Sequence, residues 1–319
     1  MINYDNLKPK PKEFLAVTGL THEEFVPLLA AFAQIYLAQT AQRTAEGKPR
    51  LRQPGAGTKG KLAQMENKLL FILAYQKGYE LQTFLALHFG ISQPQANYWI
   101  HRLLPVLQQA LATLKQTPER DPAAVADIVG PENTPPDLIL DGTERRRQRP
   151  QDSVRQKEDY SGKKKAHTNK NLILTDPNTR RIVYLGPTTA GKTHDKKMAD
   201  TEQIAYPLGT TLFQDTGFQG YAPAGVSVQQ PCKKPKGREL DLGEKFFNGV
   251  LSAVRIVVEH SISGIKRCRI VKDVLRNTKE GFSDLIMEVA CALHNLRVTF
   301  RQPLPNYDIL ERAKESYSR

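Results

Sequence analysis

A change of hydrophobic periodicity near the middle of the chain constrains the fold more than any other feature of the sequence. Before residue 117, apolar residues recur at the three- and four-residue spacing of helices, as in 25–39 and 65–77. After residue 137 they gather in short runs such as 210–215, which are typical of buried strands. We therefore predict an all-α region followed by an α/β domain.

The segment between these regions is rich in proline and acidic residues, which interrupt the helical pattern. We interpret this segment as a linker. The predicted division of the chain is a helical region over 1–116, a linker over 117–136, an α/β domain over 137–302 and a tail over 303–319.

The charge of the chain restricts its partners. Its 319 residues include 46 lysines and arginines against 33 acidic residues, a formal net charge of +13. This excess favours a polyanion such as nucleic acid, and a membrane surface is the weaker alternative. No segment reaches the roughly 18 consecutive apolar residues of a membrane span, and the first residues lack a signal-peptide core, so we expect a cytoplasmic protein. The three cysteines are scattered, which argues against a zinc site or a disulfide framework.

Residues 81–107 have the layout of a helix-turn-helix. Gly90 suits the turn, and Ser92 with Gln95 can cap the second helix. The apolar residues that we expect to be buried are Leu81, Phe84, Leu85, Ala96, Ile100 and Leu103. The polar face that remains carries Gln93, Gln95, Asn97, Tyr98, His101 and Arg102.

Polar side chains on such a face can bond base edges and phosphates. We predict Gln93, Asn97 and Arg102 as DNA contacts, and an ordinary helical hairpin with a solvated face is the alternative. The basic, glycine-containing stretch 47–61 could follow a phosphate backbone as a flexible arm.

Three acidic residues stand at informative places in the second half of the chain. Asp141 and Asp215 each end a predicted strand, and Glu259 projects from the polar stripe of a helix over 246–266. If the three converge, their oxygens suit two Mg²⁺ ions, with Mn²⁺ as a substitute, and attack on a phosphodiester. The alternative is that the aspartates form turns or caps and that Glu259 pairs with Arg255 or Lys266 on a solvated face.

Several motifs of the second half resemble the catalytic core of bacterial insertion-sequence DDE transposases, in the insertion-sequence-five and Harbinger-like branch. The resemblance spans about 137–300, and the helical half is similar to the helix-turn-helix region that precedes this core. The motifs, in the order of the family, are DGTE at 141–144, RP at 149–150, YSGKKKAHTNK at 160–170, GKTHD at 191–195, QDTGFQGY at 214–221 and RIVVEHSISGIKR at 255–267.

The resemblance implies a ribonuclease H-like fold, a mixed sheet flanked by helices, in which Asp141, Asp215 and Glu259 bind two divalent ions. It implies metal-dependent cleavage and transfer of DNA strands. The implied partners are double-stranded DNA, both the terminal inverted repeats and the target, and further copies of the chain on that DNA. It also places the protein at the bacterial nucleoid when DNA is bound.

The family carries a Tyr-Arg-Glu-Lys signature around the glutamate. Arg255, Glu259 and Lys266 stand at the matching offsets, whereas Ser252 occupies the place of the tyrosine. Arg255 and Lys266 are therefore expected to contact DNA phosphates.

The connection after Asp141 is strongly basic, and we expect a loop that lies at the rim of the site. Its cations would clamp the phosphates around the scissile bond, and a solvated charge run is the alternative. The residues concerned are Arg145, Arg146, Arg147, Lys163, Lys164, Lys165 and Lys170.

These observations together predict a DNA transposase. Two other classes of protein remain open. One is a domesticated DNA-binding protein that has kept the fold and lost the reaction. The other is a ribonuclease H-like nuclease or junction resolvase that cuts DNA without joining it.

Overall fold

The computed structural model describes residues 1–42, 60–129, 135–235 and 237–301. These residues form two compact units. Unit 1 comprises Met1–Thr117, Lys266–Asp273 and Leu285–Arg297, and unit 2 comprises Pro118–Ile265, Val274–Asp284 and the segment from Val298. The expected domain over 137–302 is therefore not continuous, because two of its segments pack with the helical unit. The expected tail over 303–319 and most of the basic stretch 47–61 lie outside the described residues.

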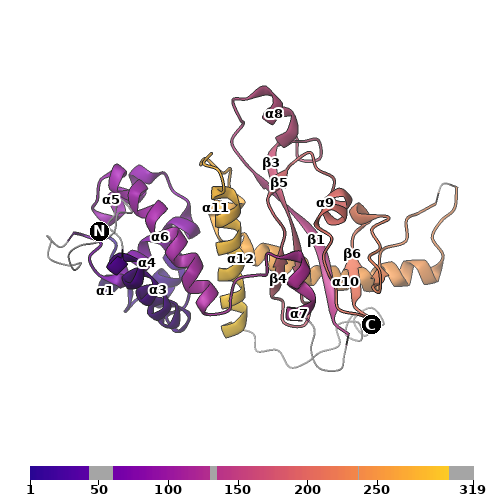
Figure 1. The fold of residues 1–319 in the computed structure, drawn as a ribbon, viewed down its shortest axis with the longest axis horizontal. Coiled ribbons are helices and arrows are strands. Elements are labelled where there is room, and N and C mark those ends of the chain that lie inside the picture. Colours follow the sequence, from indigo (N-terminus) through magenta and orange to yellow (C-terminus); the bar gives the residue numbers. More distant parts are fainter. Residues whose placement is uncertain (43–59, 130–134, 236, 302–319) are drawn as a thin grey trace. The chain divides into compact units, whose positions relative to one another are not determined.

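Unit 1 is all-α, as predicted (Figure 1). Its core is formed by fully buried side chains such as Phe14, Phe25, Phe71 and Ile100. Its elements are α1 (Tyr4–Leu7), α2 (Pro11–Thr18), α3 (His22–Gln42), α4 (Met65–Gly78), α5 (Gln82–Phe89), α6 (Gln93–Thr113), α11 (Arg269–Lys272) and the central part of α12 (Phe282–Arg301).

The start of α6 follows the predicted capping box. The Ser92 N–H donates to Gln95 Oε1 at 3.0 Å, and the Gln95 N–H donates to Ser92 Oγ at 3.4 Å. Gly90 ends α5 with φ +64°, a left-handed conformation that glycine adopts without strain. The helix-turn-helix layout of α5 and α6 is thus fixed by local sequence.

Unit 2 contains a mixed seven-stranded sheet, which agrees with the predicted ribonuclease H-like α/β fold. The strand order is β2-β3-β1-β6-β7, and β4 and β5 also pair with β3. β1 runs antiparallel to β3 and parallel to β6. The strands are β1 (Asp137–Arg146), β2 (Tyr160–Ser161), β3 (Ala166–Thr175), β4 (Ile182–Leu185), β5 (Thr189–Ala190), β6 (Thr211–Gln214) and β7 (Ser227–Gln229).

Helices pack on this sheet through apolar side chains. Leu138 and Leu140 of β1 belong to one core cluster with Met198 and Ala199 of α9 (Asp195–Glu202). α10 (Leu242–Ile265) buries Val250, Leu251, Val254 and Val258 and contacts β1 and β6. The remaining helices of unit 2 are η1 (Pro122–Ala124), α7 (Val125–Val129), α8 (Ser153–Asp159) and η2 (Thr216–Phe218).

The expected linker over 117–136 is not a free connection in its described part. Val125 is fully buried in the core of unit 2. The Glu119 N–H donates to the carbonyl of Val183 at 2.8 Å, and the Leu185 N–H donates to the carbonyl of Glu119 at 3.0 Å. The segment from Pro118 thus belongs to unit 2. Within the described residues, no helix is long and apolar enough to cross a membrane.

β1 is longer than the sequence indicated. The sequence pattern predicts an end at Asp141, but the strand continues to Arg146, which pairs with Thr168 of β3. Pairing with β3 satisfies the backbone groups of residues 142–146, so polar side chains do not prevent a strand here. The expected basic loop therefore begins later, after Arg146.

Candidate active site

The register of two parallel strands brings Asp141 and Asp215 together. Leu140 of β1 and Gln214 of β6 are register partners, and each aspartate is the next residue of its strand or turn. Asp141 Oδ1 accepts the N–H of Gly142 at 2.7 Å. Asp215 is the N-cap of η2, and its Oδ1 accepts the N–H of Gly217 at 2.6 Å. Each carboxylate is therefore oriented by the backbone that follows it.

The two carboxylates lie in a partly buried and electrostatically unfavourable place. Burial raises the pKa of Asp141 to about 6, and the negative charges of Asp215 and Asp195 also raise it. The N–H of Gly142 and the guanidinium of Arg255 act in the opposite direction. Arg255 Nη2 lies 3.8 Å from Asp215 Oδ2. A cation bound between the aspartates would relieve the repulsion between them.

The donor chemistry of this pair fits Mg²⁺ or Mn²⁺, because both ions prefer carboxylate oxygens. The predicted third ligand is not brought to the pair. Among the residues described here, no group of three or more His, Cys, Asp or Glu residues is placed to hold a metal ion. Glu259 is exposed on α10, whereas Arg255, one helical turn earlier, reaches Asp215. Ser252, which stands in the place of the family tyrosine, is also exposed.

Sequence reasoning did not assign a role to Asp195, the first residue of α9. A Cβ added at Gly142 would lie 3.2 Å from Asp195 Oδ1, and one added at Gly217 would lie 3.2 Å from Asp195 Oδ2. Asp195 therefore lies against the backbone that orients both aspartates. Asp195 could have been singled out from the sequence, because it ends the GKTHD motif at 191–195, one of the motifs that resemble the family.

Two of the residues that we predicted to contact phosphates form hydrogen bonds and an ion pair inside unit 2 instead. Arg145 is only 4% exposed and donates to Asn171 Oδ1 at 2.6 Å. Lys170 Nζ lies 3.0 Å from Asp195 Oδ1 and donates to the carbonyl of Thr193 at 2.9 Å. Both residues lie in paired strands, β1 and β3, and not in a loop. The expectation that these two residues clamp DNA is therefore wrong for this arrangement.

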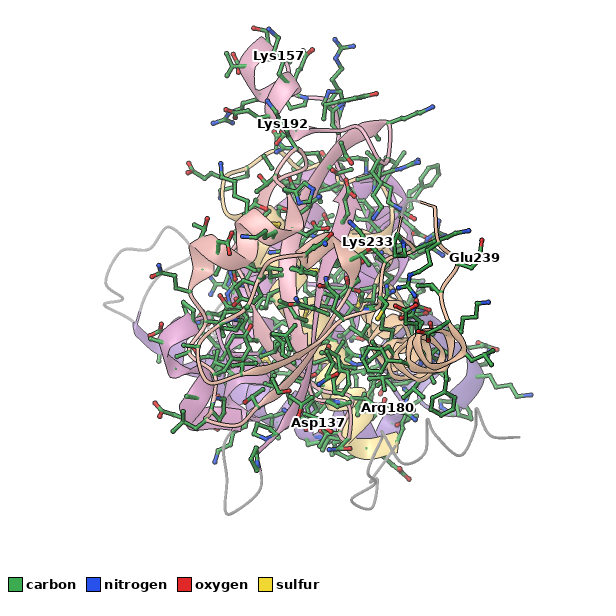
Figure 2. The ribbon with its side chains drawn as sticks, turned by 90° about the vertical axis from the view of Figure 1, so that its right-hand side faces the viewer. Asp137, Lys157, Arg180, Lys192, Lys233 and Glu239 are labelled. Carbon is green, nitrogen blue, oxygen red and sulfur yellow. The ribbon has the colours of Figure 1, made fainter. Side chains whose placement is uncertain are left out.

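Other predicted cations do face solvent. Arg146 ends β1 and is exposed, and Lys163, Lys164 and Lys165 are exposed in the turn between β2 and β3. Lys157 of α8 and Lys192 of the turn before α9 lie at the same end of unit 2, opposite Asp137 (Figure 2). The Lys192 N–H donates to the carbonyl of Glu158 at 3.0 Å, which joins this turn to α8.

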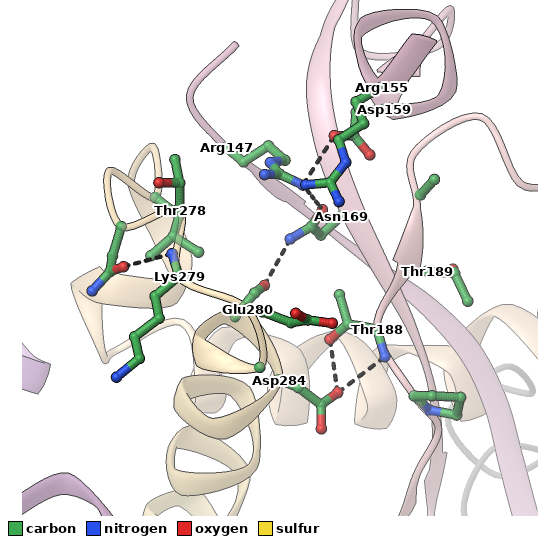
Figure 3. Close-up of a pocket in the computed structure, with 16 residues that line it drawn as sticks. Arg147, Arg155, Asp159, Asn169, Thr188, Thr189, Thr278, Lys279, Glu280 and Asp284 are labelled. Atoms are coloured by element: carbon green, nitrogen blue, oxygen red, sulfur yellow. Dashed lines mark hydrogen bonds and ion pairs between the residues drawn. The ribbon is translucent and has the colours of Figure 1, made fainter. Parts of the chain in front are cut away.

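Arg147 lines a polar pocket of about 460 Å³ in unit 2 (Figure 3). Its Nη1 lies 2.9 Å from Asp159 Oδ2 and donates to Asn169 Oδ1 at 3.4 Å. Arg155 and Lys279 also line the pocket, whereas the paired aspartates do not. Arg147 is thus partly neutralised where it lies.

The three predicted DNA contacts of the helix-turn-helix differ in their exposure, and all three form hydrogen bonds within unit 1. Gln93 is exposed, and its Nε2 donates to Gln82 Oε1 at 2.7 Å. Asn97 is half-buried and donates to the same oxygen at 3.2 Å. Arg102 is also half-buried, donates to Thr40 Oγ1 at 3.1 Å and lies over the ring of Tyr36. Arg102 is therefore engaged within unit 1.

The buried face of α5 differs from the expected one. Leu85 is buried as predicted, but Leu81 and Phe84 are 51% and 53% exposed. Ala86 and Phe89 are buried in their place, and the ring of Phe89 packs edge-on against Phe71 of α4. Lys266, another predicted phosphate contact, is half-buried directly after α10 and belongs to unit 1.

Comparisons with known proteins agree with this architecture. A family model described as DDE superfamily endonuclease matches residues 140–295, and one described as helix-turn-helix of DDE superfamily endonuclease matches residues 60–113. The probable transposase for insertion sequence element IS702 from Microchaete diplosiphon is 26% identical over 218 residues, which are 68% of this chain and 75% of that protein. No solved structure gives a significant match. The branch of the family stays a prediction, but the paired aspartates, the helix-turn-helix and the two matched regions support an insertion-sequence DDE transposase.

Proposed function

We propose that the chain binds the ends of its own insertion sequence and catalyses metal-dependent cleavage and transfer of DNA strands. The observation that carries this proposal is the neighbouring placement of Asp141 and Asp215, each directly after the register partners Leu140 and Gln214 of parallel β1 and β6, within the region that matches the endonuclease family. Two oriented carboxylates at such a place supply oxygen ligands of the kind that divalent cations prefer, which supports the proposal.

Asp141 and Asp215 hold the ions in this proposal, and Glu259 completes the set of ligands. Two Mg²⁺ ions, or Mn²⁺ in their place, would activate the attacking oxygen and stabilise the leaving oxygen of a phosphodiester. The backbone N–H groups of Gly142 and Gly217 keep the two aspartates in one orientation, which lowers the entropic cost of binding cations.

A change at α10 is needed for Glu259 to reach the aspartates. Arg255 and Glu259 are four residues apart, so they lie on the same side of α10, about 6 Å apart along its axis. Arg255 is the residue that now faces Asp215. We expect that, when DNA and metal bind, α10 shifts so that Glu259 faces the aspartates in place of Arg255. Arg255 then contacts a phosphate. Lys266 follows on the same chain segment and stays a proposed phosphate contact.

DNA is held, in this proposal, by both units. Gln93 and Asn97 at the start of α6 read base edges of the terminal repeats, and the exposed lysines 163–165 with Arg146 contact phosphates of end or target DNA. We also propose that the chain acts as a homo-oligomer on DNA, with separate copies holding the two ends of the element.

A strand-transfer experiment tests this function. Labelled element-end DNA and a supercoiled target plasmid are incubated with the full chain and Mg²⁺. We expect cleaved ends and joined products, both lost in Asp141→Asn and Asp215→Asn while DNA binding is kept. Cleavage without joined products would identify a nuclease. Specific binding by the unaltered chain without any cleavage would identify a DNA-binding protein that has lost the reaction.

A further inference from the structure

A third carboxylate lies against the backbone of both active-site aspartates. Asp195 begins α9, and its two oxygens face Gly142 and Gly217, each 3.2 Å from where a Cβ would stand. These are the same two glycines whose N–H groups orient Asp141 and Asp215. One carboxylate therefore occupies the space beside both orienting glycines, which are far apart in sequence.

Asp195 is itself held in place. Lys170 of β3 donates to Asp195 Oδ1 at 3.0 Å and to the carbonyl of Thr193 at 2.9 Å. The side chains of Lys170 and Asp195 are 12% and 24% exposed, so solvent screens this pair only in part. A carboxylate in the first turn of α9 is also favoured by the helix dipole. The pair joins β3 to the start of α9 directly behind the aspartates.

We propose that Asp195 is a positioning residue for the active site. It supports the backbone of Gly142 and Gly217. Its negative charge, which the positive charge of Lys170 partly offsets, favours a divalent cation at Asp141 and Asp215. This inference rests on the proposed metal-dependent function. A purely structural role is the competing explanation, in which the pair with Lys170 only anchors α9 to β3.

The two explanations differ in the sign of their effects on metal affinity. Asp195→Asn removes a negative charge at nearly constant shape, so cation binding should weaken. Lys170→Gln removes a positive charge and keeps a hydrogen-bond donor, so cation binding should strengthen. If the ion pair of Lys170 and Asp195 only anchored α9 to β3, both substitutions would change the cation affinity in the same direction or leave it unchanged.

The experiment is titration of the full chain with Mn²⁺ by calorimetry, without DNA. We expect Asp195→Asn to weaken Mn²⁺ binding by about 10-fold, because changes to residues that support metal ligands typically cost about 10- to 100-fold, and Lys170→Gln to strengthen it by about 3-fold. Asp200→Asn on the same helix is the matched control, because Asp200 is exposed and pairs with Lys196. It should bind Mn²⁺ like the unaltered chain.

Asp141→Asn separates this inference from the proposed function. If Asp141→Asn and the unaltered chain bind Mn²⁺ alike, the proposed metal site fails and the role of Asp195 fails with it. If Asp141→Asn loses binding while Asp195→Asn keeps the unaltered affinity, only the role of Asp195 is overturned. Circular dichroism checks that each variant folds. If Asp195→Asn does not fold, the test rests on Lys170→Gln, and weaker or unchanged Mn²⁺ binding by that variant overturns the inference.

Discussion

Arg255 Nη2 lies 3.8 Å from Asp215 Oδ2, while Glu259, four residues later on the same helix, is exposed. The helix thus presents a cation to the aspartates where the family pattern calls for an anion. The charge of Arg255 stabilises the carboxylate pair in the absence of metal and opposes a divalent ion at the same place. Two substitutions on α10 should therefore have distinct consequences.

Glu259→Gln should abolish metal-dependent cleavage, by at least about 10³-fold, because it removes one of the three proposed ligands. The same change should shift the melting temperature by less than about 2 °C, since substitutions at exposed positions seldom change stability by more than about 0.5 kcal/mol. Cleavage rate and thermal unfolding of one preparation check both statements. Near-normal cleavage would remove Glu259 from the site.

Arg255→Gln should strengthen Mn²⁺ binding to the DNA-free chain, because it removes the positive charge nearest Asp215. It should also weaken binding of end DNA if Arg255 contacts a phosphate in the complex. Calorimetry with Mn²⁺ and a DNA mobility assay measure the two effects. Unchanged Mn²⁺ affinity would show that Arg255 does not compete with the cation.

The exposed lysines of the β2–β3 turn should contribute mainly through phosphate contacts. Lys163→Ala combined with Lys164→Ala should lower DNA affinity with little dependence on sequence, and should flatten the slope of log affinity against log salt by about one to two units. Lys234→Ala is the control, because Lys234 is exposed and already paired with Glu239. An unchanged slope in the double variant would leave these lysines as solvated charges.

Sequence preference should reside at the start of α6. Gln93→Ala combined with Asn97→Ala should reduce the preference for end DNA over random duplex, by about 1–3 kcal/mol for each base that the helix no longer reads. The full chain is needed for this measurement, because α11 and part of α12 belong to the same unit as α6. Competition with random duplex at fixed salt gives the ratio, and an unchanged ratio would assign specificity elsewhere.

The stability of the chain should fall as the pH rises through the range in which half-buried Glu202 ionises. Burial raises the pKa of Glu202 to about 7, against the opposing effect of the Tyr184 hydroxyl, which donates to its Oε2 at 2.7 Å. The unfolded chain loses this proton near pH 4.5, so between about 4.5 and 7 the folded state binds more protons. The stabilisation is therefore complete below about pH 4.5 and is lost as the pH approaches 7.

Melting temperatures at pH 5 and pH 8 check this expectation. Glu202→Gln should show a smaller decrease between the two pH values than the unaltered chain, because its side chain does not titrate. Glu158→Gln, at an exposed position, is the control and should keep the original difference. Equal differences in all three proteins would contradict the assignment to Glu202.

Features with a local cause were predictable from the sequence. The helical first half, the capping box of Ser92 and Gln95 and the turn at Gly90 depend on residues close together in the chain. Asp215 directly follows β6, as its strand pattern predicted, whereas Asp141 lies within β1, and the parallel register of β1 and β6 makes the two neighbours. The motifs around these residues also pointed to the family that the comparisons support.

The roles of the cations and of the third and fourth acids were decided by tertiary structure. The sequence pattern predicts that Arg145 and Lys170 are cations of an exposed loop. Pairing of β1 with β3 instead places them inside unit 2, where Arg145 donates to Asn171 and Lys170 pairs with Asp195. The rotation and position of α10 set whether Arg255 or Glu259 faces Asp215, and neither follows from helical periodicity. Burial and charge pairing depend on which strands and helices meet, whereas a sequence pattern records only which residues lie on one face of an element.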